Sequence, residues 1–160
     1  GPAGLQILIG RLRGAIPDLA LRTTLLVGYP GETEEDFEET LEVVRKVRYD
    51  SAFTFIYSKR TGTPAAAMEN QVPEEVVKER FDRLLAEVQA ISAQVCGRDV
   101  HTVQEVLVEE PDSHVEGLVT GRMSNNTIVH FPGGKELIGK IVKVYLEESK
   151  GFYYMGSLVD

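Results

Sequence analysis

Cysteine is nearly absent from this 160-residue chain, which contains Cys96 alone. A single cysteine cannot form a disulfide within the chain, nor can it supply a cysteine-rich metal site. The three histidines, His101, His114 and His130, also lack the short spacings typical of metal ligands. The chain is therefore expected to bind no metal by itself, and a reducing, cytoplasmic setting is the default expectation.

Long apolar runs are missing too, since no stretch approaches the roughly 20 residues needed to cross a bilayer. The N-terminus, Gly1-Pro2-Ala3-Gly4, lacks the basic start and apolar segment of a signal peptide. Gly1-Pro2 is instead typical of the residues that a protease leaves behind when a tag is removed. We expect no membrane partner.

Basic residues are outnumbered by acids, so the net charge is −8. Because phosphate contacts need Lys and Arg, this balance disfavours a generic polyanion binder, although it leaves room for a local basic patch. Seven acids and no base lie between Glu32 and Glu42, and such a run usually forms the solvated face of a helix.

Helical and strand patterns alternate in the first part of the chain. Apolar spacings of three and four predict a helix over residues 5–16, and "LALRTTLLVG" predicts a strand at residues 19–28. Thr33 and Asp36 predict a capping box at the start of a helix that runs to about Val47. A second strand is predicted over residues 51–58. This order implies a parallel sheet, and because two strands are too few to stand alone, we expect a piece of a larger α/β domain.

The pattern changes after a loop at residues 58–73 and a long helix that begins near Glu74 and stops at Gly97. Five strand candidates with period two follow, at residues 102–110, 115–122, 126–133, 139–148 and 151–159. Their even spacing and glycine turns predict a small five-stranded antiparallel barrel or sandwich. We therefore expect two domains, an α/β part with a trailing helix at residues 1–99 and an all-β part at residues 100–160.

The stretch "VGYPGETEED" at residues 27–36 is the first candidate site. It matches neither the dinucleotide fingerprint nor the P-loop. Pro30 removes an amide that a phosphate would need, and Glu32 would repel one. We interpret the stretch as a strand-to-helix turn at the rim of a barrel, which is where active sites form in parallel α/β barrels.

Two further segments have chemistry that suits ligands. "SKRTGTP" follows the strand that ends at Tyr57, and it is either a solvated connection or a contact for an anion or substrate. "TGRMSNNTIVHFPG" and "SKGFYYMG" combine Arg, Lys, amide and aromatic side chains, as RNA-binding barrels do. Structural roles are the alternative to RNA binding for these residues. They are a hairpin turn at Asn125-Asn126, a place in the core for Phe152, and burial of either Tyr153 or Tyr154.

Four segments together carry a resemblance to a known family, in the order "VGYPGETEEDFEETLEVV", "YDSAFTFIYSKRTGTPAAAM", "QVPEEVVKERFDRL" and "GRMSNNTIVHFPG". They closely resemble the radical SAM methylthiotransferases. The last three look like the tRNA branch, which makes 2-methylthio-N6-isopentenyladenosine at tRNA position 37. The resemblance implies an α/β piece from the end of a radical SAM TIM-like barrel, a linking helix, and a TRAM domain that binds tRNA.

The resemblance also implies site residues. Val27, Gly28 and Glu32 match the region that lines the S-adenosylmethionine pocket. Ser58, Arg60 and Thr63 belong to the loop near the substrate mouth. The residues that match the TRAM segment facing RNA are Arg122, Asn125, Asn126, His130 and Phe131. Lys150 and Tyr153, from "SKGFYYMG", are expected to contact RNA on their side-chain chemistry alone.

Two departures from the family pattern limit what the chain can do alone. The family holds its 4Fe–4S cluster with a C-x-x-x-C-x-x-C motif, which is not present here. The chain is therefore expected to be a C-terminal fragment, inactive alone, whose missing N-terminal domains hold the clusters and help to bind S-adenosylmethionine. Thr24 stands where the tRNA branch usually has an aspartate, and "LALRTTLLVGYPGE" looks more like the sibling enzymes that modify a ribosomal-protein aspartate. Either the parent is simply variable at this position, or the chain is joined from two parents.

Two other hypotheses concern the chain as it stands. It could be a stand-alone, non-catalytic RNA-binding module. The exposed edges of a partial parallel barrel would also invite pairing between copies, so a dimer is expected as an alternative to the monomer.

Overall fold

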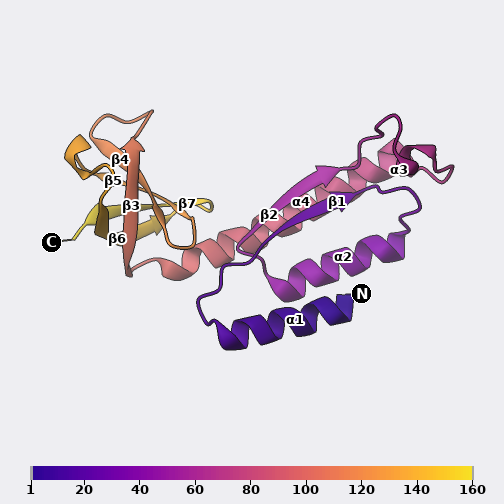
Figure 1. Ribbon diagram of the computed structural model, residues 1–160, viewed down its shortest axis with the longest axis horizontal. Coiled ribbons are helices and arrows are strands. Elements are labelled where there is room, and N and C mark those ends of the chain that lie inside the picture. Colours follow the sequence, from indigo (N-terminus) through magenta and orange to yellow (C-terminus); the bar gives the residue numbers. More distant parts are fainter. Residues whose placement is uncertain (1, 160) are drawn as a thin grey trace. The chain divides into compact units, whose positions relative to one another are not determined.

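The computed structural model describes residues 2–159 and separates into two compact units, Gly1–Ile91 and Ser92–Asp160 (Figure 1). Within residues 2–159, no helix has both the length and the apolar character that crossing a membrane requires. Each unit has its own buried core, so each is described separately.

The first unit contains two parallel strands and the helices around them. Its elements are α1 (Pro2–Ala15), β1 (Arg22–Val27), α2 (Glu34–Val47), β2 (Ser51–Ile56), α3 (Pro64–Ala67) and most of α4 (Glu74–Cys96). Strands β1 and β2 pair in parallel from Arg22 opposite Ser51 to Val27 opposite Ile56, as the helix–strand order predicts. Helix α3 is one short turn inside the segment expected to be a loop.

Helix α2 begins with the predicted capping box. The Thr33 hydroxyl accepts a hydrogen bond from the Asp36 amide at 3.1 Å, and the Asp36 carboxylate accepts one from the Thr33 amide at 2.9 Å. The Thr33 hydroxyl also donates to the Asp36 carboxylate at 2.9 Å, and the bonds that this carboxylate accepts from the Thr33 amide and hydroxyl lower the pKa of the Asp36 carboxyl. The box satisfies two amides at the helix start and fixes the direction in which α2 leaves the turn.

One face of the β1–β2 pair is left open. Its other face packs against the buried sides of α2 and α4, which include Phe37, Leu41, Val44 and Leu84. On the open face, Leu26, Phe53 and Phe55 are each about half exposed. Helix α1 is similar, because Ile9 is the one residue of its predicted apolar side that is buried. Apolar exposure on this scale is typical of a surface that another element covers.

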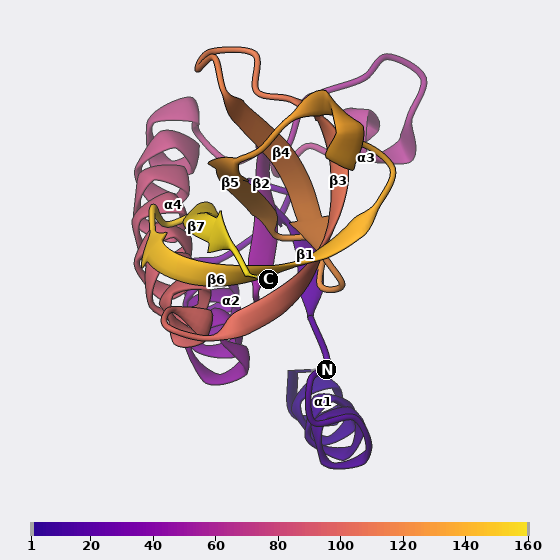
Figure 2. The same cartoon turned by 90° about the vertical axis from the view of Figure 1, so that its left-hand side faces the viewer.

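The second unit is a closed barrel built from β3 (Val103–Pro111), β4 (Leu118–Met123), β5 (Ile128–Pro132), β6 (Ile141–Ser149) and β7 (Tyr153–Leu158), in the order β3-β4-β5-β7-β6 (Figure 2). The prediction of a five-stranded barrel is confirmed, but the fully antiparallel arrangement is wrong, because β5 and β7 run parallel. The reason is geometric. Strand directions cannot alternate all the way around a ring with an odd number of strands, so at least one neighbouring pair must be parallel.

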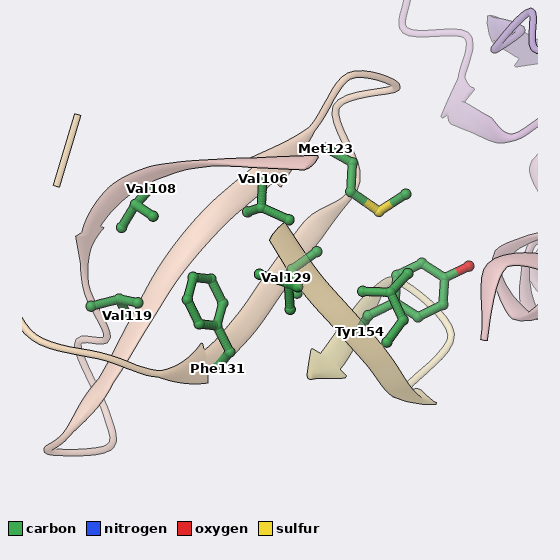
Figure 3. Packing of buried hydrophobic residues seen from close by; sticks show 9 residues of the cluster. Val106, Val108, Val119, Met123, Val129, Phe131 and Tyr154 are labelled. Carbon is green, nitrogen blue, oxygen red and sulfur yellow. The ribbon is translucent and has the colours of Figure 1, made fainter. Parts of the chain in front are cut away.

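The barrel interior is filled by alternate residues of all five strands (Figure 3). The buried set is Val106, Val108, Val119, Met123, Val129, Phe131, Val144, Leu146 and Tyr154. Gly121 and Gly156 lie where strands cross closely, since a Cβ atom at either position would stand 2.5 Å from a backbone oxygen of the neighbouring strand. The interior is therefore a packed core with no room for a ligand.

The residues that fill the barrel show that one predicted RNA contact is wrong. They also show which of Tyr153 and Tyr154 is buried and that Phe152 lies outside the core. Phe131 is fully buried, because the period of two that turns its neighbour His130 outward turns Phe131 inward. Of the tyrosine pair, Tyr154 is the buried member and Tyr153 faces outward. Phe152 is not a core residue, since it is 70% exposed at the hairpin between β6 and β7.

Candidate nucleic-acid interface

Three of the predicted RNA contacts share one outer surface of the barrel. We call it the β4–β5–β7 face and define it by the outward residues Thr120, Arg122, Ile128, His130, Tyr153 and Met155. The strand register places Thr120 opposite His130, and Ile128 opposite both Arg122 and Tyr153. The face thus presents a guanidinium, an imidazole and a phenol ring side by side, which are groups that hold phosphates and stack on bases.

Arg122 is held at the edge of this face by two partners. Its Nε donates to Glu109 Oε2 at 3.0 Å and its Nη1 donates to Asn126 Oδ1 at 3.1 Å. Glu105, Arg122, Ser124 and Asn126 also line a hollow of about 340 Å³. An RNA phosphate at Arg122 would have to compete with Glu109 for the guanidinium. Because an exposed ion pair contributes little energy, Glu109 would weaken phosphate binding without preventing it.

Asn125 and Asn126 stabilise the turn between β4 and β5. Asn125 Oδ1 accepts from the Thr127 amide at 3.0 Å, and Asn126 has a positive φ of 66°. The turn reading is therefore correct for both residues, and Asn126 additionally orients Arg122. Their role in RNA binding stays a prediction.

His130 is the centre of a compact polar cluster. Its Nδ1 lies 2.7 Å from Asp112 Oδ2 and 3.0 Å from the Thr120 hydroxyl. The ring meets the Tyr153 ring edge to face, with centroids 5.0 Å apart. Asp112 also accepts the backbone amides of His114 and Val115, and these two bonds, followed by the charge of His130, lower the pKa of the Asp112 carboxyl.

Lys150 and Phe152 occupy the hairpin next to Tyr153. The Lys150 ammonium donates to Glu148 Oε1 at 2.7 Å, and this bond raises the pKa of Lys150. Residues 97–159 contain nine Asp and Glu residues but six Lys and Arg residues, so the basic groups of the barrel stand among acids. The sequence left Phe152 open between a candidate RNA contact and a core residue, because a Phe-Tyr-Tyr run gives no sign of which ring leaves the core.

The residues expected near S-adenosylmethionine make internal bonds in the first unit. Val27 is buried and its carbonyl accepts from the Tyr57 amide, while the Gly28 amide donates to Glu32 Oε2 at 3.1 Å. Glu32 Oε1 accepts from Arg80 Nη1 at 2.8 Å. These contacts shape the turn at the end of β1, and its role beside a cofactor stays a prediction.

Arg80, on α4, holds this turn in place and was missed by sequence reasoning. It is 5% exposed, and it donates to the Glu32 carbonyl and to the Glu34 carboxylate as well as to the Glu32 side chain. Its guanidinium also lies 5.7 Å from the centre of the Phe37 ring. The signal was its position, three residues after Val77 inside the apolar stripe of α4, where a charged residue needs a buried partner.

Ser58, Arg60 and Thr63 lie together around a hollow of about 360 Å³ that Leu26 and Tyr57 also line. The Thr63 hydroxyl donates to the Arg60 carbonyl at 2.8 Å and accepts from the Ala66 amide, so it caps α3. The Tyr57 hydroxyl is buried without a hydrogen-bond partner among residues 2–159. A ligand with a polar group could satisfy that hydroxyl, and the role of this loop as a substrate contact stays a prediction.

Metal ligands do not gather anywhere in the part of the chain that is described. No group of three His, Cys, Asp or Glu side chains is placed to hold an ion within residues 2–159. Cys96 is half-buried at the end of α4, beside the core of the barrel. The 4Fe–4S cluster that the family resemblance implies needs three cysteine ligands, and Cys96 supplies one thiol at most. The ligands of such a cluster would therefore have to come from other polypeptide.

Comparison with known proteins finds similarity over both units. The TRAM domain model matches residues 97–159. The chain is 58% identical over 153 residues to a tRNA-2-methylthio-N(6)-dimethylallyladenosine synthase of Lachnoclostridium phytofermentans, a match that covers 96% of this chain and 34% of that protein. Proteins of the same name from Acetivibrio thermocellus and Carboxydothermus hydrogenoformans are 49% and 48% identical over 95% of the chain, and the matches cover 32% and 34% of their lengths. The chain spans about a third of the curated relatives it matches.

Proposed function

We propose, from the premise that this chain is homologous to the C-terminal region of the tRNA-2-methylthio-N(6)-dimethylallyladenosine synthases and contains a TRAM domain, that it is the tRNA-binding part of such an enzyme. The observation that carries the proposal is the β4–β5–β7 face. It presents Arg122, His130 and Tyr153 together on the outside of a barrel whose interior is closed to ligands.

The enzyme's substrate would be an adenosine that already carries the dimethylallyl group, as in the names of the relatives. Both units align with the same relative over 96% of the chain, which supports one parent rather than a chain joined from two. It also supports the tRNA branch over the ribosomal-protein branch, despite Thr24. The proposed setting is the cytoplasm, where tRNA is modified.

The first unit would supply one wall of the catalytic domain. Its half-exposed Leu26, Phe53 and Phe55 lie on the open face of β1–β2, and we propose that the missing N-terminal part of the parent covers this face and completes the barrel. The 4Fe–4S clusters and S-adenosylmethionine of the parent would supply the radical and sulfur chemistry when bound. The residues of this chain would shape the pocket through the turn held by Glu32 and Arg80 and through the loop from Ser58 to Thr63.

Binding of tRNA by the 160-residue chain is the direct test. We expect saturable binding that weakens steeply with salt, because phosphate contacts release counterions. Arg122→Ala should weaken binding and reduce the salt slope by about 1, as expected when one phosphate contact is lost. Lys143→Ala is the matched control, since Lys143 is an exposed base on β6, outside the β4–β5–β7 face, and should leave both values unchanged.

The parent's reaction is tested with the full-length enzyme, reconstituted with its cluster and given dimethylallylated tRNA and S-adenosylmethionine. A methylthio product in the tRNA digest is expected. Product on a ribosomal protein and none on tRNA would favour the sibling activity instead. Salt-sensitive tRNA binding with no product on either substrate would favour a stand-alone RNA-binding module.

A further inference from the structure

We infer that Asp112 is a positioning residue that orients His130 so that the Nε2 atom of His130 donates to an RNA phosphate, which couples RNA binding to the uptake of one proton. The inference rests on the proposed tRNA binding and adds to it a named contact, its chemical partner and a pH dependence.

Asp112 is built into the barrel more firmly than a surface carboxylate. Its side chain is 7% exposed. One oxygen, Oδ1, accepts the amides of His114 and Val115 at 2.8 and 2.9 Å. The other, Oδ2, lies 2.7 Å from His130 Nδ1 and accepts from the Thr120 hydroxyl at 3.3 Å. The loop after β3 therefore holds the carboxylate still and aims its second oxygen at the histidine.

This geometry decides which ring nitrogen carries a hydrogen. A lone pair on Nδ1 would face the carboxylate oxygen at 2.7 Å and repel it, so Nδ1 must be the protonated nitrogen. The Thr120 hydroxyl can then accept from Nδ1 while it donates to Asp112. The other nitrogen, Nε2, is left for a ligand. It is an acceptor in the neutral ring and a donor in the imidazolium.

The ring of His130 would lie between Asp112 on one side and the proposed phosphate on the other. The ring interacts with the Asp112 carboxylate from the loop after β3, with the Thr120 hydroxyl from β4 and with the Tyr153 ring from β7. Of the charged side chains, Asp112 meets the ring directly, whereas Lys150 interacts with Tyr153 and is itself paired with Glu148. A phosphate at Nε2 would add a second negative charge, so the imidazolium would lie between two anions. Histidine is the side chain that changes charge between about pH 5 and 8, so this coupling falls in a measurable range.

The test measures the affinity of the 160-residue chain for tRNA between pH 6 and pH 8 at constant ionic strength. For one coupled proton, the dissociation constant should rise by up to about tenfold per pH unit in the upper part of the range. Calorimetry in buffers of different ionisation enthalpy should show proton uptake, by at most one proton for each RNA bound. His130→Gln should flatten the pH profile and abolish the uptake. His114→Gln, a change in the same loop that keeps the Asp112 backbone contacts, should behave like the wild type.

Asp112→Asn separates positioning from contact. The amide oxygen can still accept the two backbone bonds, which turns the NH2 group toward His130 Nδ1, so a neutral ring would accept at Nδ1 and carry its hydrogen on Nε2. That hydrogen can be donated to a phosphate without uptake of a proton, so the pH dependence of the affinity should weaken. A second measurement needs neither RNA nor a variant, so a change in folding cannot affect it. In the free wild-type chain at pH 8, nitrogen NMR should show His130 with its proton on Nδ1.

The outcomes separate the two proposals. Failure to bind tRNA even at pH 6 would overturn the proposed function, and this inference with it. Binding that does not change with pH, or that changes equally in His130→Gln and the wild type, would overturn the inference alone. A His130 proton on Nε2 in the free chain would also overturn it.

Discussion

Removing the Arg80 side chain should strongly destabilise the first unit. The guanidinium is 5% exposed, and it donates to the Glu32 carboxylate, the Glu32 carbonyl and the Glu34 carboxylate. The side chain of Glu32 is 13% exposed. In Arg80→Met, that carboxylate would keep the Gly28 amide and lose its counter-ion. Leaving one member of a buried pair uncompensated costs about 3–5 kcal/mol of folding stability.

Urea unfolding followed by circular dichroism at 222 nm measures this cost, because the first unit contains α1, α2, α3 and most of α4. The matched control is Arg45→Met, since Arg45 is an exposed arginine with a single ion pair to Glu87. It should change the midpoint little, because surface ion pairs contribute little to stability. The partner variant Glu32→Gln should lose stability too, and the double variant should lose less than the two single losses together, because the two residues interact directly.

A loss of less than about 1 kcal/mol for Arg80→Met would refute this reasoning, because it would place the pair in the energy range of surface ion pairs. An Arg80→Met curve that coincides with the Arg45→Met curve would refute it as well. The turn at the end of β1 would then not depend on Arg80, and its proposed part in shaping a cofactor pocket would lose its support.

Three further perturbations probe the barrel. Phe131→Ala should destabilise it by about 3–5 kcal/mol, as loss of a buried phenyl ring does, and urea unfolding followed by the exchange of barrel amides would show this even without RNA. Gly121→Ala should also destabilise the barrel, because the new methyl group would stand 2.5 Å from the Leu107 carbonyl oxygen; a melting temperature equal to that of the wild type would contradict the close strand approach. The pKa of the Asp112 carboxyl is lowered from its ordinary value of 3.8, so its contribution to stability is present above about that pH and is lost as the pH falls through the folded-state pKa. Asp112→Asn should therefore lose less stability than the wild type between pH 5 and pH 2.5, and equal losses in acid titrations would contradict the assignment.

The elements were predictable where local chemistry alone decides them. Thr33 and Asp36 predict the start of α2, because a capping box forms within four consecutive residues and depends on no distant part of the chain. Period-two alternation likewise marks the strands of the barrel and the choice between inward and outward side chains. The prediction of an RNA contact at Phe131 was wrong because its aromatic ring was taken as a sign of RNA binding. The alternation itself places Phe131 on the same side of β5 as Val129, which is in the core.

Long-range pairing was beyond reach from the sequence. The parallel contact between β5 and β7 follows from closure of a ring of five strands, and closure is a property of the whole barrel. The partners of Arg80 lie 46 and 48 residues away, and those of His130 are 10 and 18 residues away in other elements. Sequence reasoning found His130 as a candidate through its residue type, but it could not find Asp112, whose importance depends on that spatial contact.

The central claim, that the β4–β5–β7 face binds tRNA, is tested most directly by NMR mapping on the isotope-labelled 160-residue chain as an anticodon stem-loop is added. We predict that the largest shift changes fall on outward residues of β4, β5 and β7, with Arg122, His130 and Tyr153 among them. Changes confined to β3 and β6, or to the first unit, would contradict the claim.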